Sequence, residues 1–298
     1  MQIERWGEIV VPDLLGPGGA ELPPLIIDGP EARFQVFGDT GKGSKAQLEV
    51  AANIVALAKE RRIHANMLVG DIIYPRGLLS ATDPKLVDLY LKPYGALSEV
   101  HLMYGNHEYG DGRGAGVPEA WLEAVRTGKA GDARIPQRYY SRRFLVDGMT
   151  IRALFLDTAT IAVDPLQLAW IKHEVDKGAD YTLVFGHHPI YSAGLHGVLA
   201  HMEKLLLPLL EGKADMYVCG HDHNLQLLRT DKGLPLMVSG SAGEERVSWR
   251  TPKTEFFSQR MGTAFITVDR EGINAEWMNG KTRESLHKAQ FARRKPLR

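Results

Sequence analysis

The chain has 298 residues, of which 44% are hydrophobic and 24% charged, a composition that excludes general disorder and suits one large domain or two small ones. Lys+Arg and Asp+Glu both number 36, and this zero net charge argues against a nucleic-acid partner bound through its phosphates. No apolar run approaches the roughly 18 residues of a membrane span, so no membrane partner is expected. The chain has one cysteine, Cys219, which excludes a disulfide framework and a cysteine-rich zinc site.

The chain begins with residues 1–30, which carry charged side chains and several Gly and Pro residues. This segment lacks the unbroken apolar centre of a secretory leader. We therefore expect an N-terminal extension that packs on the domain, and a cytoplasmic protein; the alternative is an exported protein whose leader is absent from this sequence.

Short apolar runs alternate with helical patterns over residues 31–280, where we expect a single domain. The expected strands lie at 34–37, 66–69, 100–104, 139–146, 150–157, 181–185, 214–219, 224–229, 236–239, 262–268 and 274–277. The expected helices lie at 46–60, 84–91, 118–125, 165–177 and 198–210. Asp147-Gly148 joins two strands as a hairpin. βαβ units followed by a β-rich end predict an α/β sandwich.

The chain ends with residues 281–298, which hold seven basic residues against a single acidic one, Glu284. A run of like charges of this kind is typical of a solvated segment. The sequence therefore predicts a basic C-terminal tail beyond the domain.

Five of the expected strands end in a polar turn that contains glycine. The turns read Gly38-Asp39-Thr40-Gly41, Gly70-Asp71-Ile72-Ile73-Tyr74, Gly105-Asn106-His107-Glu108, Gly186-His187-His188 and Gly220-His221-Asp222-His223. Ligands of open α/β sheets bind outside the carboxyl ends of the strands, where glycine lets the backbone turn sharply. We therefore expect all five turns to meet at one rim.

The side chains of these turns are oxygen and imidazole donors, without thiolates. Such a set suits iron, manganese or zinc and is too rich in nitrogen for calcium. It also exceeds what one ion needs, whereas two metals that share a bridging carboxylate would use every donor. Metal pairs about 4 Å apart clamp the attacking and leaving oxygens of a displacement at phosphorus.

These motifs, in this order and each after a strand, resemble those of the calcineurin-like metallophosphoesterase superfamily, and within it the small, tartrate-resistant type of purple acid phosphatase. The first turn has no histidine two places after Asp39, and Tyr74 follows Asp71 by three residues. Residues 156–158 and 219–226 are also close to the small phosphatases. The resemblance covers about residues 34–241 and implies the metallophosphoesterase fold, a four-layer αββα sandwich with two mixed β-sheets.

The resemblance also implies how the donors divide between two metals. A ferric ion would be held by Asp39, Tyr74 and His223, a divalent iron, zinc or manganese ion by Asn106, His187 and His221, and Asp71 would bridge them. Anionic phenolate and carboxylate suit Fe(III), whereas neutral amide and imidazole suit a divalent ion. The implied activity is that of an acid phosphatase, in which a metal-bound hydroxide attacks a phosphate monoester in line.

Further roles follow from the same resemblance. Small phosphorylated molecules are the expected substrates, contacted by Asn106, His107 and His188, and the leaving alkoxide would take its proton from His107 or His196. Glu108 is expected to orient a neighbouring group through a hydrogen bond. Residues 159–166 are fewer than in the animal members, which predicts an open rim. The oligomeric state is left open.

Two other functions remain compatible with the sequence. One is a phosphodiesterase or nucleotide hydrolase that uses two divalent metals, with Tyr74 outside the ligand set. The other is a non-catalytic binding module that keeps the fold for protein contacts; the complete ligand set argues against it.

Overall fold

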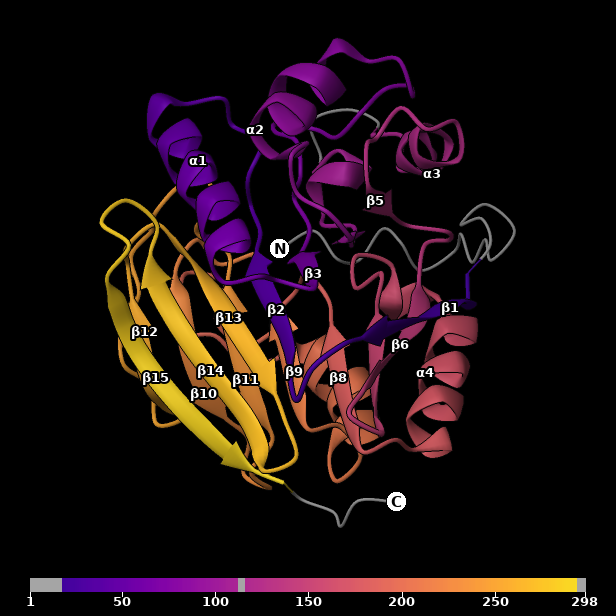
Figure 1. Cartoon of the computed structure of the whole chain (residues 1–298), viewed down its shortest axis with the longest axis vertical. Helices are drawn as coiled ribbons and strands as arrows, with labels where there is room; N and C mark the ends of the chain where they lie inside the picture. The colour runs from indigo at the N-terminus through magenta and orange to yellow at the C-terminus, as the bar shows by residue number, and fades with distance from the viewer. Residues whose placement is uncertain (1–17, 112–115, 294–298) are drawn as a thin grey trace.

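Two mixed β-sheets pack face to face in the computed structural model, which describes residues 18–111 and 116–293 (Figure 1). The first sheet has, in spatial order, strands β1 (Ala20–Ile27), β6 (Tyr140–Val146), β7 (Met149–Phe155), β8 (Tyr181–Phe185), β9 (Met216–Cys219), β11 (Pro235–Ser239), β10 (Leu225–Arg229) and β12 (Thr254–Ser258). The second has strands β15 (Ser285–Ala292), β14 (Gly272–Asn279), β13 (Gly262–Val268), β2 (Ala32–Phe37), β3 (Ala65–Leu68), β4 (Val100–Leu102) and β5 (Ala133–Arg134).

Helices cover the outer faces of both sheets. They are α1 (Lys45–Glu60), α2 (Lys92–Tyr94), α3 (Glu119–Arg126), α4 (Pro165–Lys177) and α5 (Leu207–Leu210), with short helical turns at Leu86–Leu91, His107–Tyr109, Ile161–Val163 and Met202–Leu206. Helix α1 buries Val50 and Ile54 against the core that contains β2, whereas α4 buries Ile171 in a separate cluster with Val184 of β8. The four-layer αββα sandwich with two mixed sheets is thus confirmed.

The core between the sheets contains close contacts between rings of opposite sheets, one edge-to-face and one stacked. Phe34 of β2 meets Phe144 of β6, with ring centroids 4.9 Å apart, and His101 of β4 lies parallel to Phe155 of β7 at 4.5 Å. Because these pairs join one sheet to the other, they fix the distance between the two sets of strand ends.

The predicted hairpin is confirmed. Strands β6 and β7 pair antiparallel up to Val146 and Met149, and both turn residues, Asp147 and Gly148, have positive φ, at 49° and 74°. A two-residue turn with this backbone matches the right-handed twist of the flanking strands, and Asp-Gly tolerates it.

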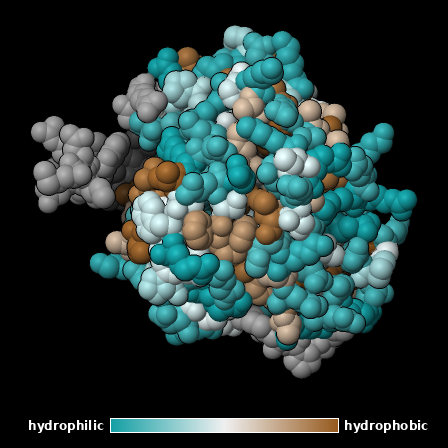
Figure 2. All heavy atoms as spheres, turned by 90° about the vertical axis from the view of Figure 1, so that its left-hand side faces the viewer, coloured by the Kyte–Doolittle hydropathy of each residue, from teal (hydrophilic) through white to brown (hydrophobic). Residues whose placement is uncertain are grey.

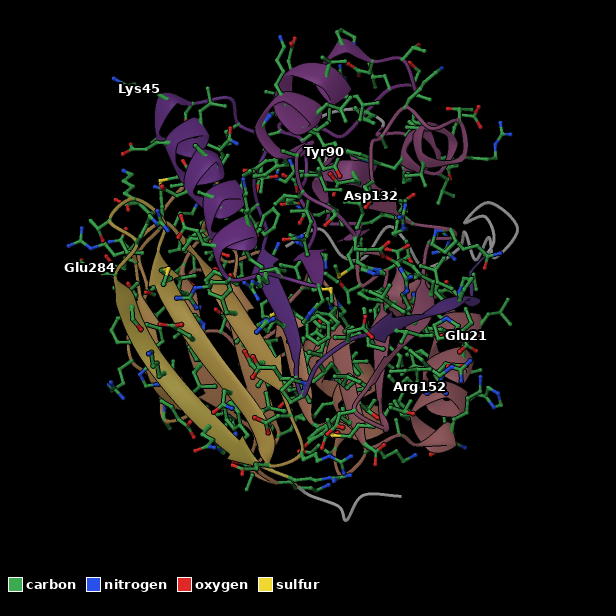
Figure 3. The ribbon with its side chains drawn as sticks, viewed as in Figure 1. Glu21, Lys45, Tyr90, Asp132, Arg152 and Glu284 are labelled. Carbon is green, nitrogen blue, oxygen red and sulfur yellow. The ribbon has the colours of Figure 1, made fainter. Side chains whose placement is uncertain are left out.

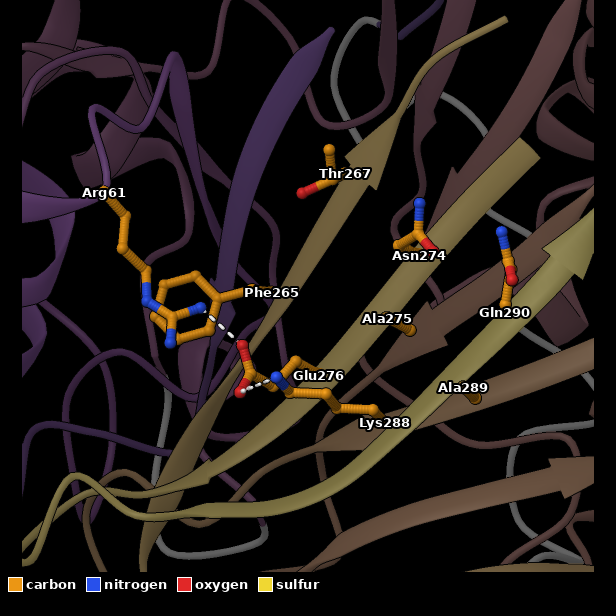
Figure 4. Close-up of a pocket in the computed structure, with 9 residues that line it drawn as sticks. All are labelled: Arg61, Phe265, Thr267, Asn274, Ala275, Glu276, Lys288, Ala289 and Gln290. Atoms are coloured by element: carbon orange, nitrogen blue, oxygen red, sulfur yellow. Dashed lines mark hydrogen bonds and ion pairs between the residues drawn. The ribbon is translucent and has the colours of Figure 1, made fainter. Parts of the chain in front are cut away.

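The prediction of a solvated tail from residue 281 is wrong for β15. This strand pairs with β14 over its length, buries Phe291, and stacks His287 on Phe256 of β12 with centroids 4.5 Å apart. Lys288 faces Glu276 at 3.7 Å on the outer face, where Glu276 also meets Arg61 at 2.6 Å (Figure 4). The basic residues obscured the alternation of buried and exposed side chains that marks an edge strand. Residues 294–298 lie outside the described part.

The first described strand, β1, pairs parallel with β6 and so belongs to the eight-stranded sheet itself. Glu21 at its start lies 2.9 Å from Arg143 and 4.0 Å from Arg152 (Figure 3). The expected N-terminal extension otherwise falls on residues 1–17, outside the described residues.

The side where β12 and β15 lie is mostly hydrophilic, with apolar residues gathered near the middle of the face (Figure 2). Within residues 18–111 and 116–293, no helix combines the length and apolar character needed to cross a bilayer.

Candidate metal centre

The five polar turns meet at one edge of the sandwich. Strands β2, β3 and β4 are parallel neighbours in one sheet, and β8 and β9 are parallel neighbours in the other, so their carboxyl ends point the same way. The two sheets are joined there: the backbone N–H of His221, after β9, donates to Asp39 Oδ2, after β2, over 2.9 Å. The prediction of a common rim is therefore confirmed.

Glycine is required where these turns cross. A Cβ on Gly105 would lie 2.1 Å from Asp71 Oδ1, and one on Gly220 would lie 2.5 Å from Asp39 Oδ2. No larger residue fits without moving a carboxylate of the rim. Gly105 and Gly220 thus serve the close approach of carboxylates from neighbouring turns.

Three of the predicted donors sit in left-handed backbone. Asp39, Asp71 and His221 have φ of 57°, 49° and 69°, which costs a non-glycine residue of order 1–3 kcal/mol. The strain directs each side chain sharply away from its strand and into the rim. Residues held this way cluster at functional sites, where the surrounding structure compensates the cost.

The first group of donors surrounds the Tyr74 hydroxyl. It lies 3.2 Å from Asp39 Oδ1, 3.1 Å from Asp71 Oδ2 and 3.1 Å from His223 Nε2. Two carboxylates, a phenol and an imidazole nitrogen thus converge on one small volume.

The second group surrounds His187 Nε2. It lies 3.1 Å from Asn106 Oδ1, 3.1 Å from His221 Nδ1 and 3.4 Å from Asp71 Oδ2. Asp71 Oδ2 therefore belongs to both groups. The structure brings all seven predicted donors together; their role as metal ligands remains a prediction.

Two imidazoles are oriented by acceptors behind them. His187 Nδ1 lies 2.8 Å from the Val69 carbonyl oxygen, and His223 Nδ1 lies 3.0 Å from Glu244 Oε2. An Nδ1–H that donates to these oxygens leaves the Nε2 lone pair free to face the cluster, the usual arrangement of a metal-binding histidine. Glu244 also pairs with Lys42 and Arg246.

Sequence reasoning missed Glu244. A signal was present, because β11 also ends in a glycine-containing turn, Ser239-Gly240-Ser241-Ala242-Gly243-Glu244. The acidic residue stands five places beyond the strand, too far for the pattern used to find the other turns.

Glu108 fixes the turn that carries Asp71, the carboxylate that belongs to both donor groups. Its buried carboxylate accepts hydrogen bonds from the backbone N–H groups of Asp71, Ile72 and Gly105 over 2.8–3.0 Å. The orienting role predicted for it is confirmed, since it joins the turn after β3 to the turn after β4. Burial and the nearby Asp71 carboxylate raise the pKa of Glu108 to about 8.

The electrostatics of the cluster favour positive charge. Burial, Asp39 and Asp71 raise the pKa of Tyr74 well above its usual value, so its phenol ionises only against added positive charge. Burial opposes protonation of His187, but Asp71 and Asp39 outweigh it and raise the pKa of His187 to about 10. His187 thus takes up a proton where a cation would lie, whereas burial and the neighbouring histidines His188 and His187 lower the pKa of His221 well below its usual value.

The other predicted site residues flank the cluster. The backbone N–H of His107 donates to Asp71 Oδ1 over 3.0 Å, and its Nε2 lies 3.7 Å from Asp71 Oδ2. His188 Nδ1 lies 2.9 Å from Thr158 Oγ1, and its ring centroid is 4.5 Å from that of His221. Thr158 Oγ1 also accepts the backbone N–H of His187 over 3.1 Å, a link that sequence reasoning did not foresee.

The His196 ring lies against that of His221, with the two ring centroids 4.0 Å apart. Its Nδ1 lies 2.8 Å from Oδ1 of the buried Asp222, and its side chain is 33% exposed. Asp222, treated in the sequence only as the residue between two histidines, therefore holds His196 in place.

The donor set fits a pair of metal ions. Each group offers four oxygen and nitrogen atoms, and the two groups share the carboxylate oxygen Asp71 Oδ2. Residues 32–225 match the family described as calcineurin-like phosphoesterase. The chain belongs to this family.

Individual proteins that resemble this chain point to a narrower group within the family. The chain is 30% identical to purple acid phosphatase 4 of Arabidopsis thaliana, over 86% of this chain and 82% of that one. It is 31% identical to tartrate-resistant acid phosphatase type 5 of Sus scrofa, over 71% and 70%. The resemblance to purple acid phosphatases predicted from the motifs is therefore confirmed.

A solved structure with this fold is GAP50, described as the anchor in the inner membrane complex of Plasmodium. It has a TM-score of 0.80 and 22% sequence identity, with 90% of each chain covered. At this sequence identity the similarity shows a shared fold only. The chemistry of this protein has to be argued from its own residues at the rim.

Proposed function

We propose that this protein hydrolyses phosphate monoesters at a centre of one ferric and one divalent metal ion. The observation that supports this most is the shared oxygen, Asp71 Oδ2, which lies 3.1 Å from the Tyr74 hydroxyl and 3.4 Å from His187 Nε2. One carboxylate oxygen common to two donor groups is what a bridged metal pair requires.

The two groups differ in charge, which supports two different metals. Asp39 and Tyr74 offer anionic oxygens and would hold the ferric ion with His223, whereas Asn106, His187 and His221 offer neutral donors to iron, zinc or manganese. A bound pair would supply Lewis acidity toward the phosphoryl oxygens and lower the pKa of a water molecule.

The chain's own residues would bind the substrate and move protons. The Asn106 amide, His107 and His188 border the donor cluster and would contact the phosphoryl oxygens. His196 is oriented by Asp222 and stays open to solvent, so its ring can give a proton to the leaving alkoxide from that side. His107 faces the cluster beside Tyr74, with ring centroids 4.2 Å apart, and is the second candidate donor.

The test is the visible spectrum and metal content of the purified protein. Wild type should contain iron and show a phenolate-to-iron absorption band, and Tyr74→Phe should lose the band while keeping the fold. Tyr109→Phe is the control, because Tyr109 donates to Asp157 rather than to the donor cluster. Phosphatase activity should disappear after dialysis against a strong chelator and return with metal.

Other outcomes would contradict the proposal. A colourless wild type with full activity on manganese would favour two divalent metals, and a preference for diesters would favour a phosphodiesterase or nucleotide hydrolase. An Asn106→Ala variant that hydrolyses monoesters at the wild-type rate would contradict the two-metal mechanism. A metal-loaded protein without esterase activity would favour a binding module.

A further inference from the structure

Two neighbouring histidines of the turn after β8 contact one hydroxyl group, that of Thr158. The hydroxyl oxygen lies 3.1 Å from the backbone nitrogen of His187 and 2.9 Å from the backbone nitrogen of His188. It also lies 2.9 Å from Nδ1 of the His188 ring. Thr158 is 1% exposed, so its hydroxyl has three partners within the protein and is shielded from bulk water.

The number of partners determines which atom donates to which. A threonine hydroxyl offers two lone pairs and one hydrogen. The two backbone N–H groups take both lone pairs, because an N–H can only donate. The hydroxyl hydrogen therefore points at His188 Nδ1, which must accept it with a lone pair. In the neutral His188 ring, the proton then resides on Nε2.

The preceding residue has the opposite arrangement. His187 Nδ1 lies 2.8 Å from the Val69 carbonyl oxygen, and a carbonyl oxygen can only accept. His187 Nδ1 therefore carries a hydrogen, and in the neutral ring its Nε2 offers a lone pair to the donor cluster. Two adjacent imidazoles thus have opposite tautomers, because one Nδ1 faces an acceptor and the other faces a hydroxyl whose lone pairs are taken.

The place of the Thr158 hydroxyl is fixed by the chain around it. Gln167 on α4 accepts the Asp157 N–H over 2.9 Å and donates to the Asp157 carbonyl over 3.0 Å, which anchors the backbone just before Thr158. The Asp157 carboxylate is held in turn by the buried guanidinium of Arg138 at 2.7 Å. A Cβ on Gly186 would lie 2.7 Å from the Thr158 methyl group, so this methyl packs directly on the glycine.

Position alone would allow His188 to bind a metal ion. Ring nitrogens of His187, His188 and His221 lie within 4.8 Å of one another, and three imidazoles are a common ligand set. The hydrogen on His188 Nε2 prevents this, because a nitrogen that carries a hydrogen has no lone pair to give. Moving that hydrogen to Nδ1 would point it at a hydroxyl that cannot accept it, at the cost of a buried hydrogen bond.

We propose that Thr158 is a positioning residue, which keeps the His188 proton on Nε2 and so makes this ring a hydrogen-bond donor to the phosphoryl group instead of a metal ligand. The inference rests on the proposed function, which puts phosphoryl oxygens at the rim. It goes further by assigning the direction of one hydrogen bond and by naming the residue that sets it.

The other edge of the His188 ring suits this role. Within residues 18–111 and 116–293, no group hydrogen-bonds to His188 Nε2, and the atom is not among the buried unpaired ones. The ring lies beside that of His221, with centroids 4.5 Å apart, and the residue is 8% exposed. An N–H that meets an ionised oxygen forms a charge-assisted hydrogen bond, which is stronger than a neutral one.

Nitrogen NMR of the imidazole rings tests the tautomer without any reaction. In metal-free wild type at neutral pH, His188 should show a protonated Nε2 and an unprotonated Nδ1, with its signals identified by their loss in His188→Phe. Thr158→Ser keeps the hydroxyl and should keep this pattern, whereas Thr158→Val should give a mixture of both tautomers. The Nε2–H signal should persist after zinc is added. A wild-type His188 with its proton on Nδ1, or an Nε2–H signal lost on zinc binding, would overturn the proposal.

Binding of inorganic phosphate tests the donated hydrogen bond. In calorimetry on the protein as purified with its metals, Thr158→Val should bind phosphate about tenfold more weakly than wild type, because a hydrogen bond to a charged group is lost. Thr158→Ser should restore the affinity. Thr160→Val is the matched control, since the Thr160 hydroxyl lies 3.0 Å from the Asp157 carboxylate and not against a histidine. Unchanged affinity in Thr158→Val would overturn the proposal.

A double variant separates positioning from a merely structural role. In a His188→Phe background the donor is already absent, so Thr158→Val should weaken phosphate binding no further. An equal further loss in that background would mean that Thr158 acts through the fold alone and would overturn the proposal. If wild type binds phosphate but hydrolyses no ester, the proposed function fails, while the NMR pattern and the double variant still decide the role of Thr158. A metal-loaded wild type that binds no phosphate would refute the donor role of His188.

Discussion

Two fully buried histidines, His101 and His187, have opposite surroundings. His101 lies between the sheets against Phe155, where burial and then Arg142 lower its pKa well below the usual value. His187 lies at the strand ends, where Asp71 outweighs burial and raises its pKa to about 10. Burial alone favours the neutral ring, so it is the neighbouring carboxylates that let His187 hold a positive charge, while the surroundings of His101 exclude one.

The largest effect should come from removing the shared carboxylate. Asp71→Asn should lower the metal content of the purified protein from two ions per chain to one or none, because both donor groups lose the same anionic oxygen. In the metal-free chain, the pKa of His187, followed by NMR, should fall from about 10 toward its usual value. Asp176→Asn, an exposed carboxylate on α4, is the control; an Asp71→Asn protein with both metals would disprove the bridge.

A smaller loss of metal affinity should follow from removing the hydrogen-bond acceptor that orients an imidazole of the donor cluster. Glu244→Ala removes the acceptor of His223 Nδ1, and loss of such a partner typically lowers metal affinity about 10- to 100-fold. In a chelator competition experiment, the metal affinity of the donor group that contains Tyr74 should fall. The metal affinity of the donor group around His187 should change less. Glu245→Ala is the matched control, since Glu245 is the exposed neighbour. An equal loss of affinity for both metals would contradict the prediction, because it would mean that Glu244 does not act on one donor group alone.

The smallest effect should appear in the core. His101 takes a proton near pH 6.5 in the unfolded chain but only at lower pH when folded, so its share of the free energy of unfolding falls as the pH drops below 6.5. The loss should be measurable between pH 6.5 and 5.5. In urea unfolding, His101→Phe should lose less stability than wild type over this interval, and exposed His173→Gln should behave as wild type. If the free energy of unfolding of His101→Phe falls with pH as steeply as that of wild type, the core does not disfavour protonation of His101.

Much of the fold was predictable from local pattern. The helices at 46–60 and 165–177 and the hairpin at Asp147-Gly148 agree with α1, α4 and the β6–β7 pair to within one or two residues, because periodicity and turn chemistry act within a few residues. The expected helix at 198–210 begins later, with the turn Met202–Leu206 that leads into α5.

The missed strands share a physical cause. β1, β5, β12 and β15 lie at the ends of their sheets, where one side of the strand has no neighbour and the sequence need not be apolar. β15 is the clearest case, since its Lys288 is satisfied by Glu276 of the adjacent strand, a pairing that no local pattern reveals.

The sequence by itself determined which side chains the rim would carry, because strand, glycine and donor follow one another within a few residues in each of the five turns. Only the tertiary structure decided what stands behind those donors. Glu244 reaches His223, Thr158 reaches His187 and His188, and two loops more than fifty residues apart in the chain meet at Gly194 and Ser248. Such contacts depend on how two sheets stack, which distant parts of the chain fix jointly.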